Sequence, residues 1–166
     1  MNNLTYTRHT PDNISYISDN EVFVFGSNLR GVHGAGTAKL AVNSFGAKYG
    51  QGIGLQGQSY AIPTKDYNIE TLPLAEIQLY VNEFLRFAKD NYILTFLVTK
   101  IGCGLAGYTI KDIAPMFYSV SSNVVLPKEF VDFNQKNKKI NWLAFKIHLN
   151  SDYEINRKAN QSSRVW

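Results

Sequence analysis

Residues 22–46 read VFVFGSNLRGVHGAGTAKLAVNSFG, and their pattern indicates how the chain folds. It opens on an apolar run that stops abruptly at Gly26, a pattern typical of a strand covered on both faces. Further glycines follow at positions 31, 34 and 36. Apolar residues then recur at the spacing of a helix that lies on a sheet, namely at Ala38, Ala41, Val42 and Phe45. The stretch therefore predicts a strand, a glycine loop and a helix, in that order.

The same succession recurs further along the chain. Residues 92–98 are rich in β-branched and aromatic side chains, which is typical of a central strand, and they lead into a second glycine-rich run, TKIGCGLAGY. Thr109 and Asp112 have the spacing of a capping box and predict a helix over residues 109–120. Between the two loops, an apolar stripe predicts a long helix over residues 73–88.

Shorter segments complete the expected order of elements. Weaker patterns predict strands at residues 4–8, 60–63, 123–126 and 140–149. Residues 45–58 contain five glycines and are expected to form a loop, with the freedom to act as a flap. The strand at 60–63 would deliver Thr64 and the lysine and aspartate after it to the end of the sheet.

The alternation of buried strands with amphipathic helices indicates the fold class. It predicts a three-layer α/β/α fold whose central sheet is mixed and mostly parallel. We expect residues 1–149 to form this domain and residues 150–166 to be a polar, basic tail. Ligands of such sheets bind at the C-terminal ends of the strands, which is where both glycine loops lie.

Composition supports one ordered domain and excludes several classes of protein. The chain has 166 residues, of which 45% are hydrophobic, and it contains 10 Tyr and 10 Phe, so it can bury an aromatic core. Charged residues make up only 18%. The net charge of +4 arises largely near the C-terminus, which is typical of a solvated basic edge and leaves nucleic-acid contact as the alternative.

Cysteine content and hydropathy indicate the compartment of the protein and the kinds of site that it can contain. Cys103 is the only cysteine, so no intrachain disulfide forms, and the sequence has no CxxC motif or His/Cys cluster that would bind a metal. We expect no metal and no cofactor. The first residues lack an apolar signal region, and no apolar stretch approaches about 18 residues. The expectation is a cytoplasmic protein with no membrane partner.

The two glycine loops are the main functional signal. The backbone N–H groups of the first loop, with the helix start behind it, suit a pyrophosphate, although neither the Walker pattern nor GxGxxG is present. Residues 101–108 repeat the device, so the two loops together could hold both sides of a diphosphate. The alternative is that the glycines only permit tight turns and close packing. Cys103 is either a nucleophile or, without a nearby histidine, a small buried thiol.

These residues carry a family resemblance. VFVFGSNLRGVHGAGTAKLAVNSFG and TFLVTKIGCGLAGYTIKDIAPMF resemble the two glycine-loop signatures of macrodomains, a family that binds ADP-ribose. HGAGTA at residues 33–38 and IGCGL at residues 101–105 are most similar to macrodomains of the terminal ADP-ribose glycohydrolase type, which remove terminal ADP-ribose from acidic side chains. The resemblance covers residues 21–120.

The resemblance implies a set of ligand contacts. The two loops would hold the diphosphate, Tyr108 would lie beside a ribose and Asn28 would contact the distal ribose. Asp12 is the candidate for the acidic residue that grips the adenine amino group. The implied ligand-binding residues are Gly26, Ser27, Asn28, Gly31, His33, Gly34, Ala35, Gly36, Thr64, Gly102, Cys103, Gly104, Leu105, Ala106, Gly107 and Tyr108.

Catalytic candidates follow from the same resemblance and from local chemistry. Lys65 falls where the hydrolases carry a lysine that attacks the distal ribose carbon. The acids of related hydrolases are replaced here, by Ala106 after GCGL and by Ala35 before the helix. His33 and Asp66 are local acid or base candidates. His33 could equally hydrogen-bond the backbone, and Lys65 could equally balance the diphosphate charge.

The sequence therefore predicts a macrodomain that binds ADP-ribose and hydrolyses ADP-ribose conjugates of a protein or a small molecule. Lys65, Asn28 and His33 are the expected catalytic residues. The alternative is a non-catalytic reader or sequesterer of ADP-ribose or of another NAD-derived nucleotide. A nucleic-acid-binding module that uses the basic C-terminal region is a third, less favoured hypothesis.

Overall fold

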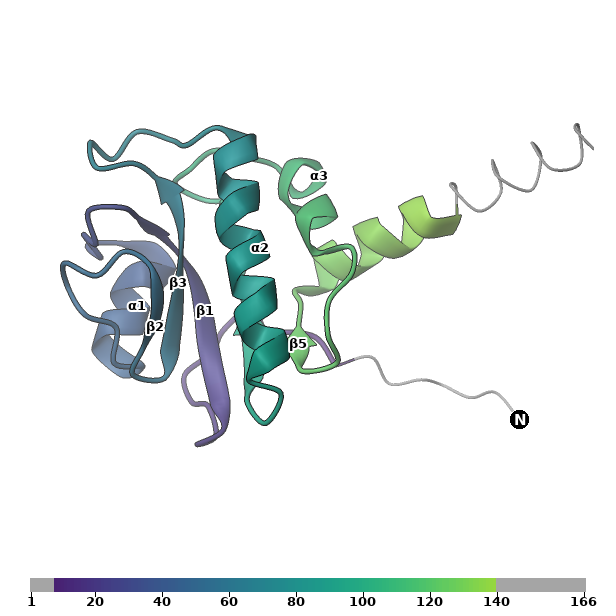
Figure 1. The fold of residues 1–166 in the computed structure, drawn as a ribbon, viewed down its shortest axis with the longest axis horizontal. Helices are drawn as coiled ribbons and strands as arrows, with labels where there is room; N and C mark the ends of the chain where they lie inside the picture. The colour runs from purple at the N-terminus through teal and green to yellow at the C-terminus, as the bar shows by residue number, and fades with distance from the viewer. Residues whose placement is uncertain (1–7, 140–166) are drawn as a thin grey trace, which may run out of the picture.

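The strand that the sequence predicts to stop at Gly26 continues to Asn28 as β1, the central strand of a five-stranded sheet (Figure 1). The computed structural model describes residues 8–139. The strands are β1 (Glu21–Asn28), β2 (Gly54–Gln56), β3 (Ser59–Lys65), β4 (Thr95–Val98) and β5 (Val124–Val125). Their order is β2-β3-β1-β4-β5, and only the β2–β3 pair is antiparallel. The sheet is therefore mixed and mostly parallel, as predicted.

Helices cover both faces of this sheet. They are α1 (Gly36–Ser44), α2 (Leu74–Asp90), α3 (Ile110–Ile113), the 3-10 helix η1 (Ala114–Phe117) and a helix over residues 128–139. Figure 1 shows α1 and α2 on opposite sides of the sheet. The fold is thus a three-layer α/β/α arrangement, which confirms the predicted class. None of the helices within residues 8–139 is long and apolar enough to cross a membrane.

Strand β1 explains why the layers form. Val22 and Val24 lie in the core on the α2 side, whereas Phe23 and Phe25 lie in a second core cluster on the α1 side. Successive side chains of a strand point to opposite faces, so a run without polar residues requires cover on both. Phe25 is fully buried. The apolar run therefore dictates the three layers.

Most helix predictions hold with small changes of boundary. The long helix begins at Leu74, one residue after Pro73, and buries Ile77 and Phe84 completely. The capping box of Thr109 and Asp112 is present, but the helix it opens is short and continues as the separate turn η1.

Two predicted strands have other bounds in the structure, and one helix was not predicted. The strand expected from residue 92 begins at Thr95, because residues 92–94 belong to the turn after α2. The strand expected at 60–63 extends over Ser59–Lys65. The helix over residues 128–139 was not predicted. It packs on η1, where the Phe117 and Phe130 ring centroids lie 5.7 Å apart.

Residues 45–58, here called the covering segment, are not loop throughout. Glycines with positive φ at its two ends, Gly46 and Gly57, turn the chain so that β2 pairs with β3. The side-chain amide of Gln51 donates to the carbonyls of Ile53 and Leu55, both at 3.2 Å. This amide therefore occupies acceptors beside and within the edge strand.

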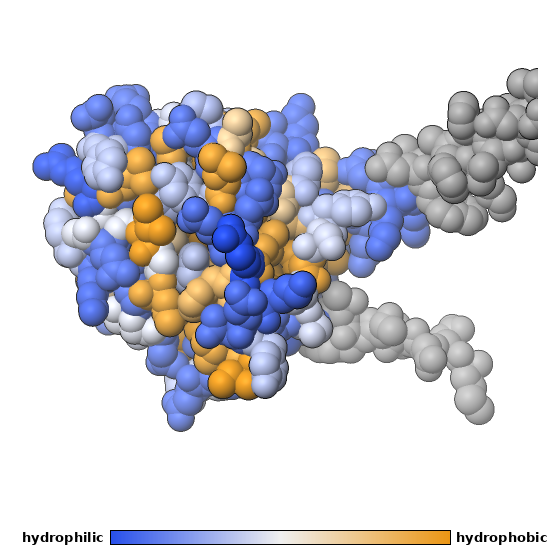
Figure 2. Space-filling view, in the orientation of Figure 1, coloured by the Kyte–Doolittle hydropathy of each residue, from blue (hydrophilic) through white to orange (hydrophobic). Residues whose placement is uncertain are grey.

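The surface and the chain ends complete the description. Figure 2 shows apolar side chains interspersed with hydrophilic ones on the face that carries α2, without one dominant patch. Such scattered exposure is ordinary for a folded domain. The strands predicted at residues 4–8 and 140–149, and the tail at residues 150–166, lie wholly or almost wholly outside the described residues.

Candidate functional site

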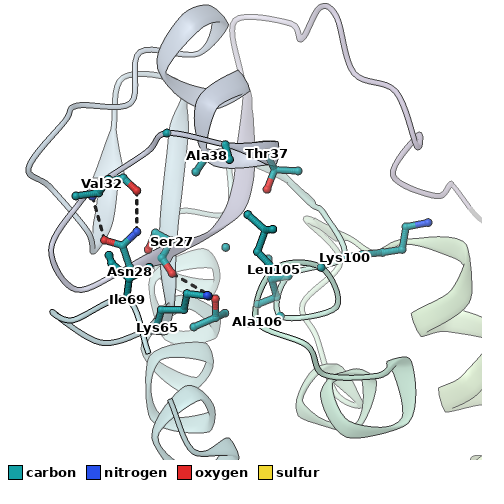
Figure 3. A pocket seen from close by; sticks show the side chains of 18 residues that line it. Ser27, Asn28, Val32, Thr37, Ala38, Lys65, Ile69, Lys100, Leu105 and Ala106 are labelled. Atoms are coloured by element: carbon teal, nitrogen blue, oxygen red, sulfur yellow. Dashed lines mark hydrogen bonds between the residues drawn. The ribbon is translucent and has the colours of Figure 1, made fainter. Parts of the chain in front are cut away.

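The C-terminal ends of β1, β3 and β4 open into one cavity of about 410 Å³, here called the main cavity (Figure 3). Most of the predicted ligand-binding residues line it: Gly26, Ser27, Asn28, Gly34, Ala35, Gly36, Thr64, Gly102, Gly104, Leu105 and Ala106, together with Lys65. The residues that sequence reasoning missed are Val32, Thr37, Ala38, Ile69, Lys100 and Ile101. Both glycine loops thus meet at one site.

Close backbone contact brings the two loops together. A Cβ on Gly26 would lie 3.6 Å from the backbone nitrogen of Gly102. Gly102 itself has φ of +71°, and a Cβ there would come within 2.9 Å of the Ile113 side chain. Since an L side chain is both strained and crowded at this position, only glycine fits well. The second loop is held against the end of β1 in this way.

Other glycines leave space rather than fill it. Gly34, Gly36 and Gly104 line the main cavity, and a Cβ added to any of them would have no atom within 4 Å. The open volume beside these residues lets a ligand approach the backbone closely. This arrangement differs from tight packing, which was the alternative explanation for the glycines.

Gly31, in contrast, fits the explanation in which a glycine permits close packing of the backbone. It has φ of +72°, and a Cβ would lie only 2.3 Å from the carbonyl carbon of Gly50 in the covering segment. A Cβ on Gly52 would come equally close to the carbonyl oxygen of Asn28, at 2.1 Å. Gly31 therefore packs the first loop under the covering segment and does not line the main cavity, so its expected contact with the ligand stays a prediction without support from this position.

The start of α1 is the polar wall of the main cavity. Gly36, Thr37 and Ala38 line the cavity and are the first residues of this helix. The N-cap residue, Ala35, has no side-chain acceptor, and the first turn contains no acidic residue. The first backbone N–H groups of a helix have no partner within it and carry partial positive charge. They are therefore available to an anion.

Asn28 lines the main cavity, but its side chain is already engaged. Its Nδ2 donates to the Val32 carbonyl at 2.7 Å, and its Oδ1 accepts from the Val32 backbone N–H at 3.0 Å (Figure 3). The residue is 7% exposed. The oxygen and the nitrogen of the side-chain amide therefore both hold the first loop. One N–H of Nδ2 remains for another contact.

His33 does not reach the main cavity. The residue is 3% exposed, and its ring packs edge-on to Phe25 and donates from Nε2 to the Gln51 carbonyl at 3.0 Å. The carbonyl only accepts, so Nε2 carries the proton, and Nδ1 has no partner among the described residues. The ring therefore holds the covering segment, and the expected contact of His33 with the ligand stays a prediction that this position does not support.

Two lysines line the main cavity and differ in their partners. Lys100 Nζ lies 2.9 Å from Asp12 and 2.7 Å from Glu129. These carboxylates raise the pKa of Lys100, with the hydrogen bond to Glu129 as the largest cause. Lys65, at the end of β3, has no ion pair or hydrogen bond from its ammonium to any residue that the structure describes. Lys65 therefore supplies the uncompensated positive charge.

Asp12 borders a second cavity of about 130 Å³. Thr37 and Lys100 line both cavities, so the two are adjacent. The second cavity also has apolar walls from Ile14, Phe23 and Leu40. A carboxylate beside apolar walls suits a flat ring that carries an amino group.

Three residues of the second loop do not line the main cavity. These residues are Cys103, Gly107 and Tyr108, and their expected ligand contacts stay predictions; Cys103 and Tyr108 border a further cavity together with Gly104 and Lys100. The Tyr108 hydroxyl donates to the Leu72 carbonyl at 2.7 Å. Burial raises the pKa of the Cys103 thiol to about 11, which keeps it protonated near neutral pH. Cys103 is thus the half-buried thiol of the sequence alternatives.

Asp66 also has a structural role. Its Oδ1 accepts from the backbone N–H groups of Asn68, at 2.8 Å, and Glu70, at 2.9 Å. The residue does not line the main cavity. The carboxylate therefore shapes the loop after β3, and the position of Asp66 does not support an acid or base role.

The groups that line the main cavity are of the kind that suits an anion. Within the described part of the chain, no Asp, Glu or His lines the main cavity, and no cluster of His, Cys, Asp and Glu could hold a metal ion. Backbone N–H groups and one unpaired ammonium remain. No protein-family model matches the chain, and no curated protein or solved structure matches it either, so its function must be argued from the site.

Proposed function

We propose that this protein binds ADP-ribose in the main cavity and the second cavity together. The observation that carries the proposal is the uncapped start of α1, which faces a cavity walled by open glycines of both loops. Backbone N–H groups at a helix start, approached without obstruction by side chains, are a recurrent site for phosphate groups. The resemblance of both loops to macrodomain signatures points to the same ligand.

Charge supports a diphosphate at this site. Lys65 stands at the cavity edge with no described partner, so its charge is available to a phosphate oxygen. Lys100 is already neutralised by Asp12 and Glu129. The diphosphate is therefore expected to lie toward Lys65 rather than midway between the two lysines.

The adjacent second cavity suits the adenine. Its apolar walls match the faces of a base, and the Asp12 carboxylate can accept a hydrogen bond from the amino group. With the base at this end, the diphosphate crosses the start of α1 and the terminal ribose reaches Lys65.

Binding without turnover is the activity that the site supports best. The lining of the main cavity has no Asp, Glu or His to act as a general acid or base among the described residues. Hydrolysis of an ADP-ribose conjugate is the second candidate, favoured by one observation, the unpaired amine of Lys65 at the expected position of the terminal ribose. Nucleic-acid binding rests on basic residues that largely lie outside the described range.

A thermal-shift panel of ADP-ribose, NAD, AMP and cyclic derivatives tests the proposal. A ligand that binds the native state raises the melting temperature, and we expect ADP-ribose to raise it more than AMP does. The variant Asp12→Asn should reduce the shift. The matched control Asp132→Asn alters a carboxylate that pairs with Lys128 and lines none of the described cavities. An unchanged melting temperature with every ligand would overturn the proposal.

A release assay separates binding from hydrolysis. Protein ADP-ribosylated on glutamate is incubated with the wild type and with Lys65→Ala, and free ADP-ribose is measured. We expect no release by either protein. Release by the wild type alone would establish the second candidate, and release that persists in Lys65→Ala would move the chemistry to another residue.

A further inference from the structure

The Lys65 end of the main cavity contains apolar side chains beside its polar ones. Ile69, Leu105 and Ala106 line it together with Lys65. Figure 3 shows the ammonium end of Lys65 directed toward Ala106, with Ile69 on one side in this view and Leu105 on the other. A terminal ribose alone would present hydroxyl groups to these side chains. Their chemistry suits something less polar.

Ile69 is held at this position against its own backbone preference. It is the only residue other than glycine with positive φ in the described range, at +69°. A β-branched residue in this region is a genuine outlier, and such strain persists only where the surroundings enforce it. Strain of this kind clusters at ligand sites.

Hydrogen bonds around the turn hold Ile69 in this conformation. The Asp66 carboxylate accepts two backbone N–H bonds across the turn that contains Ile69, and the Leu72 N–H donates to the Thr64 carbonyl at 3.0 Å. The Thr71 hydroxyl donates to the Ala106 carbonyl at 3.1 Å. The turn is therefore closed at its base and tied to the second loop. Ile69 keeps its place at the cavity wall as a result.

Leu105 is the second unexplained feature. It is 74% exposed, although it is a large apolar side chain at the wall of a cavity. An isolated exposed leucine needs no explanation, but this one lines the same cavity as the strained Ile69. Two apolar side chains presented to one space can hold the faces of a flat group between them.

We propose that Ile69 and Leu105 form an apolar clamp for a flat, uncharged ring carried by the terminal ribose of the ligand. The inference rests on the proposed function, and it makes the ligand class a dinucleotide of the NADH type rather than ADP-ribose alone. The unpaired ammonium of Lys65 disfavours a cationic ring at this end, so the reduced dinucleotide fits better than the oxidised one.

Calorimetry with the full chain tests the ligand class. ADP-ribose, NADH and NAD⁺ are titrated separately into the wild type. We expect NADH to bind about fivefold more tightly than ADP-ribose, because the clamp removes the faces of the ring from water. NAD⁺ should bind more weakly than NADH. Lys65→Gln should weaken all three ligands and bring NAD⁺ and NADH closer together.

Two substitutions test the clamp residues. Leu105→Ala and Ile69→Ala should each lower the ratio of NADH affinity to ADP-ribose affinity toward one. Leu105 is largely exposed, so its truncation preserves the fold even if Ile69→Ala does not. The matched control is Leu79→Ala, which truncates a leucine 62% exposed on α2 that lines none of the described cavities. It should leave the ratio unchanged.

The outcomes separate the two proposals. Equal affinity for NADH and ADP-ribose in the wild type overturns the clamp and leaves the proposed function standing. A preference for NADH that survives both Leu105→Ala and Ile69→Ala also overturns it. If none of the three ligands binds, the proposed function fails and takes the clamp with it.

Discussion

The two ends of the main cavity each carry a lysine, yet only one of these lysines offers its charge. Lys100 is held by Asp12 and Glu129, whereas Lys65 has no described partner and stands beside apolar side chains. The electrostatic character of a site therefore depends on unpaired charge rather than on the number of basic residues. In the proposed complex, Lys100 organises the protein and Lys65 engages the ligand.

The largest expected effect comes from filling the space between the two ends. Gly34→Val places a side chain in open space at the cavity wall, at a position without positive φ. Affinity for ADP-ribose should fall about 100-fold, equivalent to about 3 kcal/mol of steric cost, with little change in melting temperature. Calorimetry and thermal melting measure the two effects.

Gly31→Ala provides the contrast for this prediction. Its Cβ would collide with Gly50 at an unfavourable φ, so it should lower stability by about 2 kcal/mol or more. A loss of binding in Gly34→Val that is matched by an equal loss of stability would show that its glycine is structural too.

The next effect compares the two lysines directly. Lys65→Met should weaken ADP-ribose about 30-fold, because it removes charge-assisted hydrogen bonds worth about 2 kcal/mol. Lys100→Met should weaken it about threefold or less, since the lost ion pairs are exposed and already internal to the protein. Calorimetry on both variants gives the ratio. Equal losses would remove the distinction between the two ends.

The smallest effect concerns the Lys100 end alone. The hydrogen bond from Lys100 is the largest cause that holds the pKa of Glu129 below its ordinary value of 4.5. A lowered carboxyl pKa adds stability above that ordinary value, and this contribution disappears as the pH falls through the value in the folded protein. The melting temperature of the wild type should exceed that of Glu129→Gln at pH 7, and the difference should vanish under acid conditions. A difference that grows on acidification would contradict this assignment.

Much of the fold could be predicted because it depends on local pattern. The continuous apolar run from Val22 to Phe25 required cover on both faces, and the stripe that includes Ile77 and Phe84 specified α2. Strand β2 could not be predicted, since its three residues gain their conformation from pairing with β3 rather than from propensity. The helix over residues 128–139 likewise depends on contact with η1.

The candidate site was predictable in outline because both glycine loops follow parallel strands, whose C-terminal ends meet. The directions of the side chains could not be predicted. His33 and Tyr108 lie in the loops but hydrogen-bond to segments distant in sequence, Gln51 and Leu72. Ile69 carried no sequence signal, because its positive φ follows from the closed turn around it. Lys100 could have been suspected from its place immediately before the second loop.

The amide of Gln51 has a consequence for behaviour at high concentration. Strand β2 is the edge at which a neighbouring molecule could add a strand, and unpaired carbonyls there invite such pairing. The side chain of Gln51 already satisfies the carbonyls of Ile53 and Leu55. The side chain of Gln51 thus protects the protein against edge-to-edge self-association. Gln51→Ala should make concentrated solutions more prone to form β-rich aggregates.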